Sequence, residues 1–562
     1  MRHTIIKTLL LGLMLAGGAS SVWAENTVQE FGRESATNWT TSSSTTNIKF
    51  GSTVTLNGLV MTFGGSTYAT PQSTNGSTFS EDFWTWNSNN GGVVPGFMPN
   101  NGSTSSGVIS IAVGDALPTN GAVYKFELSK SGTLTINGKG GTTKGKIVLL
   151  QADNDNKVTA VLRQDAATNT AVTTTYSLEA GTYYFFQLCE GAGNVNGYRY
   201  TLKSIQFETL EPVEGLKVWN FEESGWKSVS TTSPLGVIQD QLWLSGSITY
   251  DAAQTRYNIA AGKSNQIRFK VKKGQKGYVV IVAKGTNSST GIQYGLGSKA
   301  SVDNTSKVCV GTIYKVYTST FVTCDADKDV LIHTDGNMGY IKKIAWVPNA
   351  NSATALASVT MGTAGFSTFC PTATVNIPTG VKAYILNSCS GTTATWNEIT
   401  GKIPAFTGVL LVGEGGTQYD FYCPSSSSSA IDGIVATGPT PAWYNTASTQ
   451  QNILVGTYKT TSIPASDATT SYYGLKKNTN TFGLVSANVD MPAGMAYFSV
   501  ATAEVKELHE FIFGLSGATA IHTTEQAMPQ GKQPFYTLSG MLVSGNPAPG
   551  IYVKGGKKVI IK

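Results

Sequence analysis

The sequence predicts an all-β protein, made of tandem β-sandwich modules of jelly-roll type followed by a further β domain and a short C-terminal β tail. Runs rich in Val, Ile, Thr, Tyr and Phe recur from residue 25 onward, and clusters of Gly, Asn and Ser separate them. No stretch has the spacing of an amphipathic helix. With 562 residues the chain is too long for one hydrophobic core, so several modules are expected.

The N-terminal segment has the features of a signal peptide. Arg2 and Lys7 accompany an apolar run from Leu9 to Ala16, and Val22-Trp23-Ala24 ends the segment as a cleavage site does. Residues 1–24 are therefore predicted to be a signal peptide, and the protein is expected outside the cell or on its outer surface. A membrane anchor is disfavoured because the run is shorter than the ~20 residues of a spanning helix, and no other transmembrane span is predicted.

Two parts of the chain resemble each other, which predicts a tandem repeat. "AVYKFELSKSGTLTINGKG" (122–140) and "NQIRFKVKKGQKGYVVIVAKG" (265–285) share the order strand, basic Gly turn, strand, Lys-Gly. "GYRYTLKSIQF" (197–207) and "MGYIKKIAWV" (338–347) match as closing strands. The predicted sandwiches are residues 25–210 and 211–350, with a linker at 208–215.

A third β module is predicted for residues 356–515. Pro precedes Gly by two or four positions, and an apolar strand follows, in "IPTGVKAYIL", "IPAFTGVLLVG" and "MPAGMAYFSV". Pro fixes φ at the first position of a turn and Gly takes the positive-φ or exit position, so each motif predicts a turn. Residues 516–562 form the predicted C-terminal tail.

The tail carries three motifs in a fixed order. They are "YTLSG" at 536–540, "GIYV" at 550–553 and "KVIIK" at 558–562. In this order they resemble the C-terminal sorting domains of proteins that the type IX system exports across the outer membrane of Bacteroidota. The resemblance implies that export machinery is a partner of the tail. A terminal hairpin that caps the third module is the alternative.

The two sandwiches look like the accessory jelly-roll, carbohydrate-binding-like modules of polysaccharide-active proteins from these bacteria. The strand-Gly-strand patterns of 122–140 and 265–285 carry this resemblance. It implies an exported, multidomain protein of Bacteroidota type with a polysaccharide or glycan as partner. A fold by itself does not define a function, so the argument moves to individual residues.

Charge and motif content exclude several classes of protein. The formal net charge is +6, charged residues make up 13% of the chain, and much of the positive excess lies in the tail, so a nucleic-acid partner is not expected. The histidines of the mature chain lie far apart without zinc-ligand spacing, and no GxSxG nucleophile motif with its partners can be assembled. No pair of carboxylates is marked by its context for glycoside chemistry. We therefore predict a non-catalytic protein without a cofactor.

The six cysteines form no CxxC pair. Cys309 and Cys324 are interpreted as lying on two strands of one sheet, either as a disulfide, which would contribute about 3 kcal/mol, or as two buried thiols. At least one thiol among Cys370, Cys389 and Cys423 is expected to be free or paired outside that stretch.

The segment 324–337 raises the possibility of calcium. Asp325, Asp327 and Asp329 alternate as in an oxygen-ligand loop. The sixth and twelfth positions are Val330 and Gly336, where a calcium loop has Gly and Glu, so calcium is not supported. A solvated hairpin turn is the expected structure.

One aromatic stretch of the first sandwich is a candidate glycan platform. "EDFWTWNSNNGGVVPGF" (81–97) places Trp84, Trp86 and Phe97 among Asn and Gly, together with Asp82 and Asn87. Two residues apart on an extended segment, the tryptophans share a face, and an indole face packs well against a pyranose ring. The alternative is that these rings cover the sandwich core.

The second sandwich offers three further tryptophans. Trp219 and Trp243 lie in strand-like stretches and are predicted to be core residues. Trp226 follows Gly225 and is predicted to be exposed, which adds it to the tentative glycan contacts. The leading hypothesis is thus a secreted or cell-surface protein that binds glycan through loops of the first sandwich. An adhesive or structural protein without a sugar ligand is the alternative, followed by a polysaccharide lyase or hydrolase.

Overall fold

The structure is a computed structural model of the chain. It describes residues 27–31, 47–49, 51–64, 82–87, 92–95, 110–118, 123–140, 145–168, 170–188, 200–287, 291–298, 301–302, 306–309, 311–312, 314–319, 322–349, 352–390, 393–425, 431–434, 440–441, 451–505, 510–513, 535–537, 542–543, 549–554 and 557–561. The proposed signal peptide lies outside these residues.

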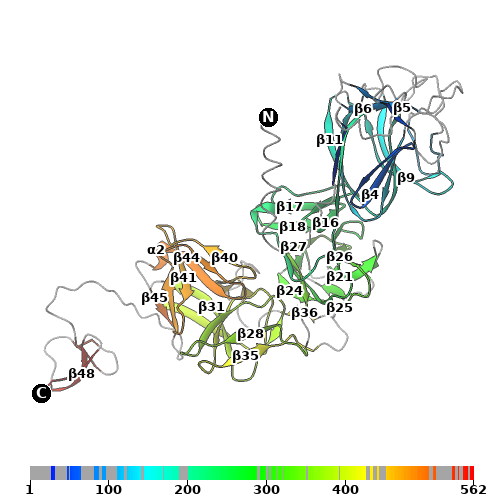
Figure 1. Cartoon of the computed structure of the whole chain (residues 1–562). Coiled ribbons are helices and arrows are strands. Elements are labelled where there is room, and N and C mark those ends of the chain that lie inside the picture. Colours follow the sequence, from blue (N-terminus) through cyan, green and yellow to red (C-terminus); the bar gives the residue numbers. More distant parts are fainter. Residues whose placement is uncertain are drawn as a thin grey trace, which may run out of the picture.

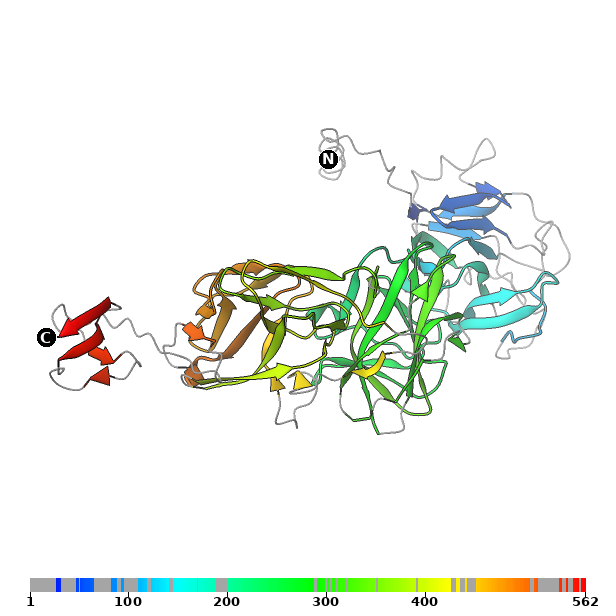
Figure 2. The same ribbon diagram turned by 90° about the horizontal axis from the view of Figure 1, so that it is seen from below.

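The fold is all-β, as the sequence predicts. Within the described part of the chain, the regular elements are strands apart from one helical turn, α2 (Thr502–Val505), and one 3-10 turn, η2 (Ser224–Trp226). Two sandwiches, a third β module and a small terminal sheet follow one another in chain order (Figures 1 and 2). In the described part of the chain no helix is both long and apolar enough to span a membrane.

The first sandwich packs two antiparallel sheets, here called sheets A and B, around one apolar core. Phe63, Phe126, Leu134 and Phe207 in this core are fully buried. Sheet A has the order β11 (Val172–Leu178), β8 (Gly132–Lys139), β13 (Thr201–Thr209), β6 (Gly92–Pro95), β5 (Asp82–Asn87), β2 (Asn47–Lys49), with β1 (Val28–Glu30) beside β13. Sheet B has the order β10 (Val158–Ala166), β9 (Lys146–Ala152), β12 (Gly181–Leu188), β7 (Tyr124–Leu128), β4 (Leu59–Phe63), β3 (Thr53–Leu56).

The second sandwich has corresponding sheets, here called A′ and B′, around a core that includes Phe269 and Trp346. Sheet A′ runs β17 (Ile248–Asp251), β18 (Arg256–Ile259), β27 (Gly339–Pro348), β20 (Lys276–Gly285), β24 (Lys315–Thr318), β36 (Ile431–Ile434), with β14 (Lys217–Asn220) beside β27 and β25 (Val322–Thr323) beside β20. Sheet B′ runs β15 (Val237–Gln239), β16 (Leu242–Ser245), β19 (Gln266–Val271), β26 (Lys328–Asp335), β21 (Gly291–Ser298), β22 (Ser301–Val302), with β23 (Ser306–Cys309) beside β21.

The strand order confirms the tandem repeat. Strands β1, β5, β6, β8 and β13 of sheet A occupy the same places as β14, β17, β18, β20 and β27 of sheet A′. A β-bulge falls at the same point of the central strand pair, between Leu202 and Ser204 in the first copy and between Val282 and Ala283 in the second. Equivalent cross-strand pairs are Ile136↔Ile205 and Ile281↔Ile344, then Lys139↔Thr201 and Lys284↔Tyr340.

The acidic stretch between the sandwiches is packed rather than free. Leu210 and Val213 are buried, and Val213 belongs to the core of the second sandwich. Their backbone N–H groups donate to Ser131 O (2.7 Å) and Lys270 O (2.7 Å), one in each sandwich. The stretch therefore connects the two copies through fixed backbone hydrogen bonds.

The third module is built of antiparallel sheets and one two-stranded parallel pair, residues 440–441 with 451–452. The larger two have the orders β29 (Phe366–Phe369), β34 (Val409–Val412), β31 (Lys382–Ser390), β32 (Thr393–Ile399), and β39 (Leu454–Gly456), β44 (Ala496–Ala501), β41 (Thr470–Leu475), β42 (Thr481–Leu484), β45 (Glu510–Ile512). Smaller pairs are β28 (Ala357–Thr360) with β35 (Gln418–Phe421), β30 (Val375–Asn376) with β33 (Lys402–Ile403), β37 (Thr440–Pro441) with β38 (Gln451–Asn452), and β40 (Thr461–Ile463) with β43 (Val489–Met491).

The three Pro-Gly motifs form turns, as the sequence predicts, with glycine at the positive-φ position in two of them and at the exit of the turn in the third. Gly380 and Gly494 have positive φ, as predicted for two of the motifs. In the third motif Phe406 takes the positive φ of 58° instead of Gly408. Gly408 is required for another reason, since a Cβ there would lie 2.9 Å from Ala496 Cβ.

The second sandwich and the third module share an apolar cluster, here called the junction core. Val280, Val282 and Val316 on the outer face of sheet A′ are fully buried in it, together with Val409 and Phe421 of the third module. Strand β36 comes from the third region of the sequence but pairs with β24 at the edge of sheet A′. Two features therefore hold the units together: the outer face of sheet A′ is buried under the third module, and strand β36 extends sheet A′.

The C-terminal motifs form a small antiparallel sheet. Its order is β47 (Leu542–Val543), β46 (Phe535–Thr537), β48 (Gly550–Lys554), β49 (Lys557–Ile561). The "GIYV" and terminal basic motifs pair with each other along their length. The sheet is more than the strand pair that the sequence indicates, because the "YTLSG" motif contributes β46 beside β48.

Two expectations about residues 309–337 are wrong. Cys324 is a free, buried thiol, and Cys309 lies on β23 of sheet B′ whereas Cys324 follows β25 of sheet A′. The two cysteines thus belong to opposite sheets and not to one. The turn at 324–327 likewise connects the two sheets rather than closing a hairpin, because β25 and the next strand, β26, pair in different sheets.

Candidate functional site

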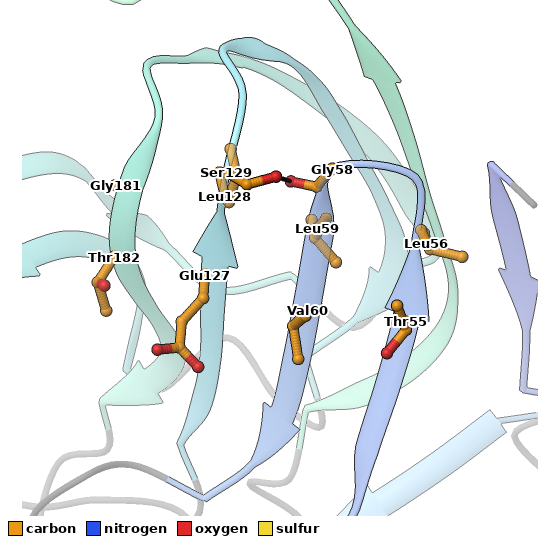
Figure 3. A pocket seen from close by; sticks show the side chains of 10 residues that line it. All are labelled: Thr55, Leu56, Gly58, Leu59, Val60, Glu127, Leu128, Ser129, Gly181 and Thr182. Atoms are coloured by element: carbon orange, nitrogen blue, oxygen red, sulfur yellow. Dashed lines mark hydrogen bonds between the residues drawn. The ribbon is translucent and has the colours of Figure 1, made fainter.

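An open hollow lined by both polar and apolar groups lies on the outer face of sheet B in the first sandwich. Thr55, Val60, Glu127 and Thr182 stand opposite one another on the adjacent strands β3, β4, β7 and β12, so they form one continuous cross-strand row (Figure 3). Their neighbours along each strand point into the core, since side chains alternate between the faces of a sheet. The hollow over this row has a volume of about 550 Å³.

A second row of side chains continues the same face. Thr53, Thr62 and Lys125 are aligned across β3, β4 and β7. Lys125 Nζ lies 2.8 Å from Glu127 Oε1, so an ion pair joins the two rows. The face therefore offers hydroxyl groups, a cation and an anion that can donate to and accept from a polar ligand.

A tight turn closes one end of the hollow. Gly58 has a φ of +78°, and a Cβ there would lie 2.8 Å from Thr209 Cγ2. The Ser129 hydroxyl donates to Gly58 O over 3.3 Å, which ties the β3–β4 turn to the end of β7 (Figure 3). Because the turn is held by backbone geometry and this bond, the strands present their side chains from a rigid frame.

The remainder of the outer face of sheet B is covered. Ile111 and Leu117 of the segment 110–118 pack with Val148, Leu150 and Tyr184 in a separate apolar cluster. The open polar area is thus limited to the β3, β4, β7 side of the sheet and the start of β12.

Part of the equivalent face of the second sandwich is covered by the first. Arg268, at the position equivalent to Lys125, is 3% exposed and stacks over the Trp243 ring with its guanidinium carbon 3.6 Å from the ring centroid. It forms an ion pair with Glu179 of the first sandwich. Trp243 donates from Nε1 to Leu235 O over 2.9 Å. Lys270 and Asp329, the equivalents of Glu127 and Thr182, are partly exposed and form an ion pair with each other over 2.9 Å.

The candidate residues of the aromatic stretch lie on the other sheet. Asp82, Trp84, Trp86 and Asn87 fall on β5 of sheet A, and Phe97 lies outside the described residues. Trp84 and Trp86 occupy register positions opposite Pro95 and Val93 of β6. The side chains of β5 are not among those described, so the choice between platform and core stays a prediction.

The expectation that Trp226 is exposed is wrong. Trp226 is 5% exposed, and its ring lies against Phe221 and Tyr257 in the core of the second sandwich, with centroids 5.2 and 6.2 Å away. The residue sits in the turn η2, which folds back onto the core. It is therefore removed from the set of glycan contacts. Trp219 and Trp243 are buried, as the sequence predicts, although Trp243 faces the first sandwich and not its own core.

The aspartates of the calcium hypothesis have partners within the protein. Asp325 pairs with Lys328 (3.4 Å), Asp329 pairs with Lys270 (2.9 Å), and Asp327 accepts from the Lys273 N–H (2.7 Å). Within the described ranges no group of three or more His, Cys, Asp or Glu side chains is placed to hold a metal ion.

Comparisons with known proteins identify no family. No family model and no curated protein matches the chain. Among solved structures, tandem CBM51 modules of a family 98 glycoside hydrolase from Streptococcus pneumoniae align at 7% identity over 51% of this chain and 93% of that one, with a TM-score of 0.15. A triple jelly-roll protein of an archaeal virus aligns at 11% identity over 55% and 88%, with a TM-score of 0.18. Likenesses at these scores carry no argument about a ligand.

Sequence reasoning missed the residues of the hollow. The signal was available in "TVTLNGLVMTF" (53–63), where polar and apolar residues alternate on both sides of an Asn-Gly turn. Such a hairpin has one face in the core and one in solvent. The sequence does not show, for either repeat copy, which sheet face is covered by a neighbouring module.

Proposed function

We propose that this protein is a non-catalytic, exported glycan-binding protein and that the first sandwich holds the binding site. The observation that carries the proposal is the open hollow over Thr55, Val60, Glu127 and Thr182 on the outer face of the first sandwich. Saccharides present hydroxyl groups above a weakly apolar ring. A shallow face with hydroxyl, carboxylate and ammonium groups around one aliphatic side chain offers partners for both.

The breadth of the hollow favours a chain over a small, enclosed ligand. It is flanked by exposed or half-exposed side chains of neighbouring strands and has no lid among the described segments. An extended polymer can lie across adjacent strands and contact several rows of side chains at once. The proposal is therefore a polysaccharide, and the aromatic stretch of β5 remains a second candidate contact in the same sandwich.

Export is proposed on two features of the sequence. The N-terminal 24 residues read as a signal peptide, and the C-terminal sheet carries the motif order of a Bacteroidota sorting tail. In a host with the type IX system, deletion of residues 516–562 is expected to retain the protein in the periplasm. Secretion of the truncated protein at the full-length level would overturn this role of the tail.

The binding proposal is tested with the full mature chain. Thr182→Arg places a long charged side chain in the hollow, and Thr173→Arg, at an exposed position of strand β11 in the other sheet, is the matched control. Polysaccharides are screened by affinity electrophoresis with Trp84→Ala/Trp86→Ala alongside. Loss of binding in Thr182→Arg alone supports the hollow as the site. Loss in the tryptophan variant alone moves the site to β5, and no binding by folded wild type favours the adhesive alternative.

A further inference from the structure

The outer face of sheet A′ changes character along its length. On β20, Val280 and Val282 are buried in the junction core, and the next residue on the same face is Lys284. Lys284 is paired in register with Tyr340 of β27. The face thus passes from an apolar part, covered by the third module, to a basic and aromatic part at its end.

Three cations converge on two tyrosine rings at this end. The Arg256 guanidinium carbon lies 3.9 Å from the centroid of Tyr340. Lys284 Nζ lies 4.9 Å from the centroid of Tyr314 and 5.8 Å from that of Tyr340. Lys342 Nζ lies 5.4 Å from the Tyr314 centroid. These five residues are called the basic–aromatic cluster.

The carboxylates near the cluster are engaged by its other cations. Asp251 Oδ2 accepts from Arg256 Nη2 over 3.1 Å. Glu222 is shared between Lys342, at 3.0 Å, and Lys343. Among the described residues no carboxylate oxygen lies within ion-pair distance of Lys284, whose ammonium group lies over the faces of two tyrosine rings. The cluster therefore carries excess positive charge, centred on Lys284.

Lys284 is held there at a cost to the folded state. Burial, together with the nearby charges of Arg256 and Lys342, lowers the pKa of the Lys284 ammonium group. The tyrosine rings stabilise the ammonium group, but among the described residues no carboxylate neutralises its charge. Such groups are found where a site must receive an opposite charge from outside the protein.

The first repeat copy shows that the sandwich does not need this cluster. The register of the two sheets places Gly92 and Thr201 of the first copy at the positions of Arg256 and Tyr340. The two lysines are common to both copies, as Lys139 with Lys284 and as Lys203 with Lys342, which lie at the shared bulge. The arginine and the tyrosine are thus particular to the second sandwich.

We propose that the basic–aromatic cluster binds an anionic group of a polysaccharide, either the carboxylate of a uronic acid or a sulfate ester. Lys284 is the cation that pairs with the anion, and Arg256 and Lys342, held by their own carboxylates and by the tyrosine rings, border the site. The inference rests on the proposed function in taking a polysaccharide as the carrier of the charge. It concerns a separate site on the second sandwich.

The test measures binding of the full mature chain to polygalacturonate, to dextran sulfate and to neutral dextran. Lys284→Met removes the charge while it retains an unbranched chain, and Lys276→Met, at the exposed opposite end of β20, is the control. We expect wild type to bind at least one anionic polymer more tightly than neutral dextran, with binding that weakens as salt increases. Lys284→Met is expected to lower the affinity for that polymer about tenfold or more, as for loss of a charged hydrogen bond, and Lys276→Met less than about twofold.

Several results would overturn the proposal. They are equal binding of anionic polymers by wild type and Lys284→Met, no preference of wild type for anionic over neutral polymers, or preferential binding to phosphatidylglycerol vesicles. Thermal unfolding distinguishes a structural role of Lys284 from a role in binding. If the ammonium–ring contact is only structural, Lys284→Met is less stable than wild type and binds the polymers equally well. Thr182→Arg, measured in parallel, distinguishes the sites: if it abolishes polysaccharide binding while Lys284→Met does not, the proposed function stands and this inference fails.

Discussion

Val282 offers the sharpest test of the junction between the second sandwich and the third module. Its side chain is fully buried in the junction core, on the face of β20 opposite to the core of its own sandwich. If the third module did not cover sheet A′, this valine would face solvent. Val282→Ala therefore measures whether the two units are packed together.

The expected loss follows from the two methyl groups removed. Their transfer from water is worth about 1.5 kcal/mol, at about 0.8 kcal/mol each, and an unrelaxed cavity adds about 1 kcal/mol. We expect Val282→Ala to lower the free energy of unfolding by about 2–3 kcal/mol. Val113→Ala, at a position that is 66% exposed in the first sandwich, is expected to change it by less than about 0.5 kcal/mol.

Hydrogen exchange is the suitable assay, because a chain of several modules does not unfold in one two-state step. Amide protection of peptides from β20 and from β34 of the third module is compared between wild type and variant under native conditions. Since both strands contribute to the junction core, both are expected to exchange faster in Val282→Ala. A loss below about 0.5 kcal/mol, or unchanged protection in β34, would refute a shared core.

Three further predictions concern packing, thiols and pH. Gly456→Ala is expected to destabilise the third module by about 1–3 kcal/mol, because the added Cβ would lie 2.2 Å from Cys370 Sγ. Gly225→Ala is the control, since a Cβ at that position meets open space. Equal urea midpoints of the two variants would contradict this prediction. Burial raises the pKa of the Cys370 thiol to about 12, so iodoacetamide should label it only after denaturation, and labelling of the native protein would be inconsistent with the fold. Burial opposes ionisation of Glu223, but hydrogen bonds from Tyr458 and Lys459 outweigh it and lower the pKa of the carboxyl group below its ordinary 4.5. The stability that this contact contributes is therefore present above pH 4.5 and lost below it, and Glu223→Gln should flatten the acid limb of the unfolding curve; an unchanged acid limb would argue against the contact.

The repeat shows how far sequence patterns reach. Alternation of apolar and polar residues in "VYKFELS" and "IRFKVKK" predicts strands with one face in a core. The Lys-Gly endings align the two copies in the same register as the structure, including the shared β-bulge. Such features are local, since they depend on side-chain alternation and turn residues within some twenty positions.

Contacts between modules are not local and could not be predicted in this way. Lys125 and Arg268 occupy equivalent positions in similar strands, yet one borders an open hollow and the other is buried under the first sandwich. The burial of Trp226 is a contact within its own sandwich, and it is not predicted either, because Gly225 indicates a turn but not that the turn folds onto the core. The site candidates therefore required the arrangement of modules in space.

The account depends most directly on whether the hollow of the first sandwich binds a polysaccharide. The decisive measurement is the affinity of the full mature chain for the best polysaccharide of the screen, compared with folded Thr182→Arg and Thr173→Arg. We predict a loss of about tenfold or more in Thr182→Arg, equivalent to about 1.4 kcal/mol, and no change in Thr173→Arg. Binding of equal strength by all three proteins would contradict the assignment of the site, and no binding by folded wild type to any polysaccharide would contradict the function.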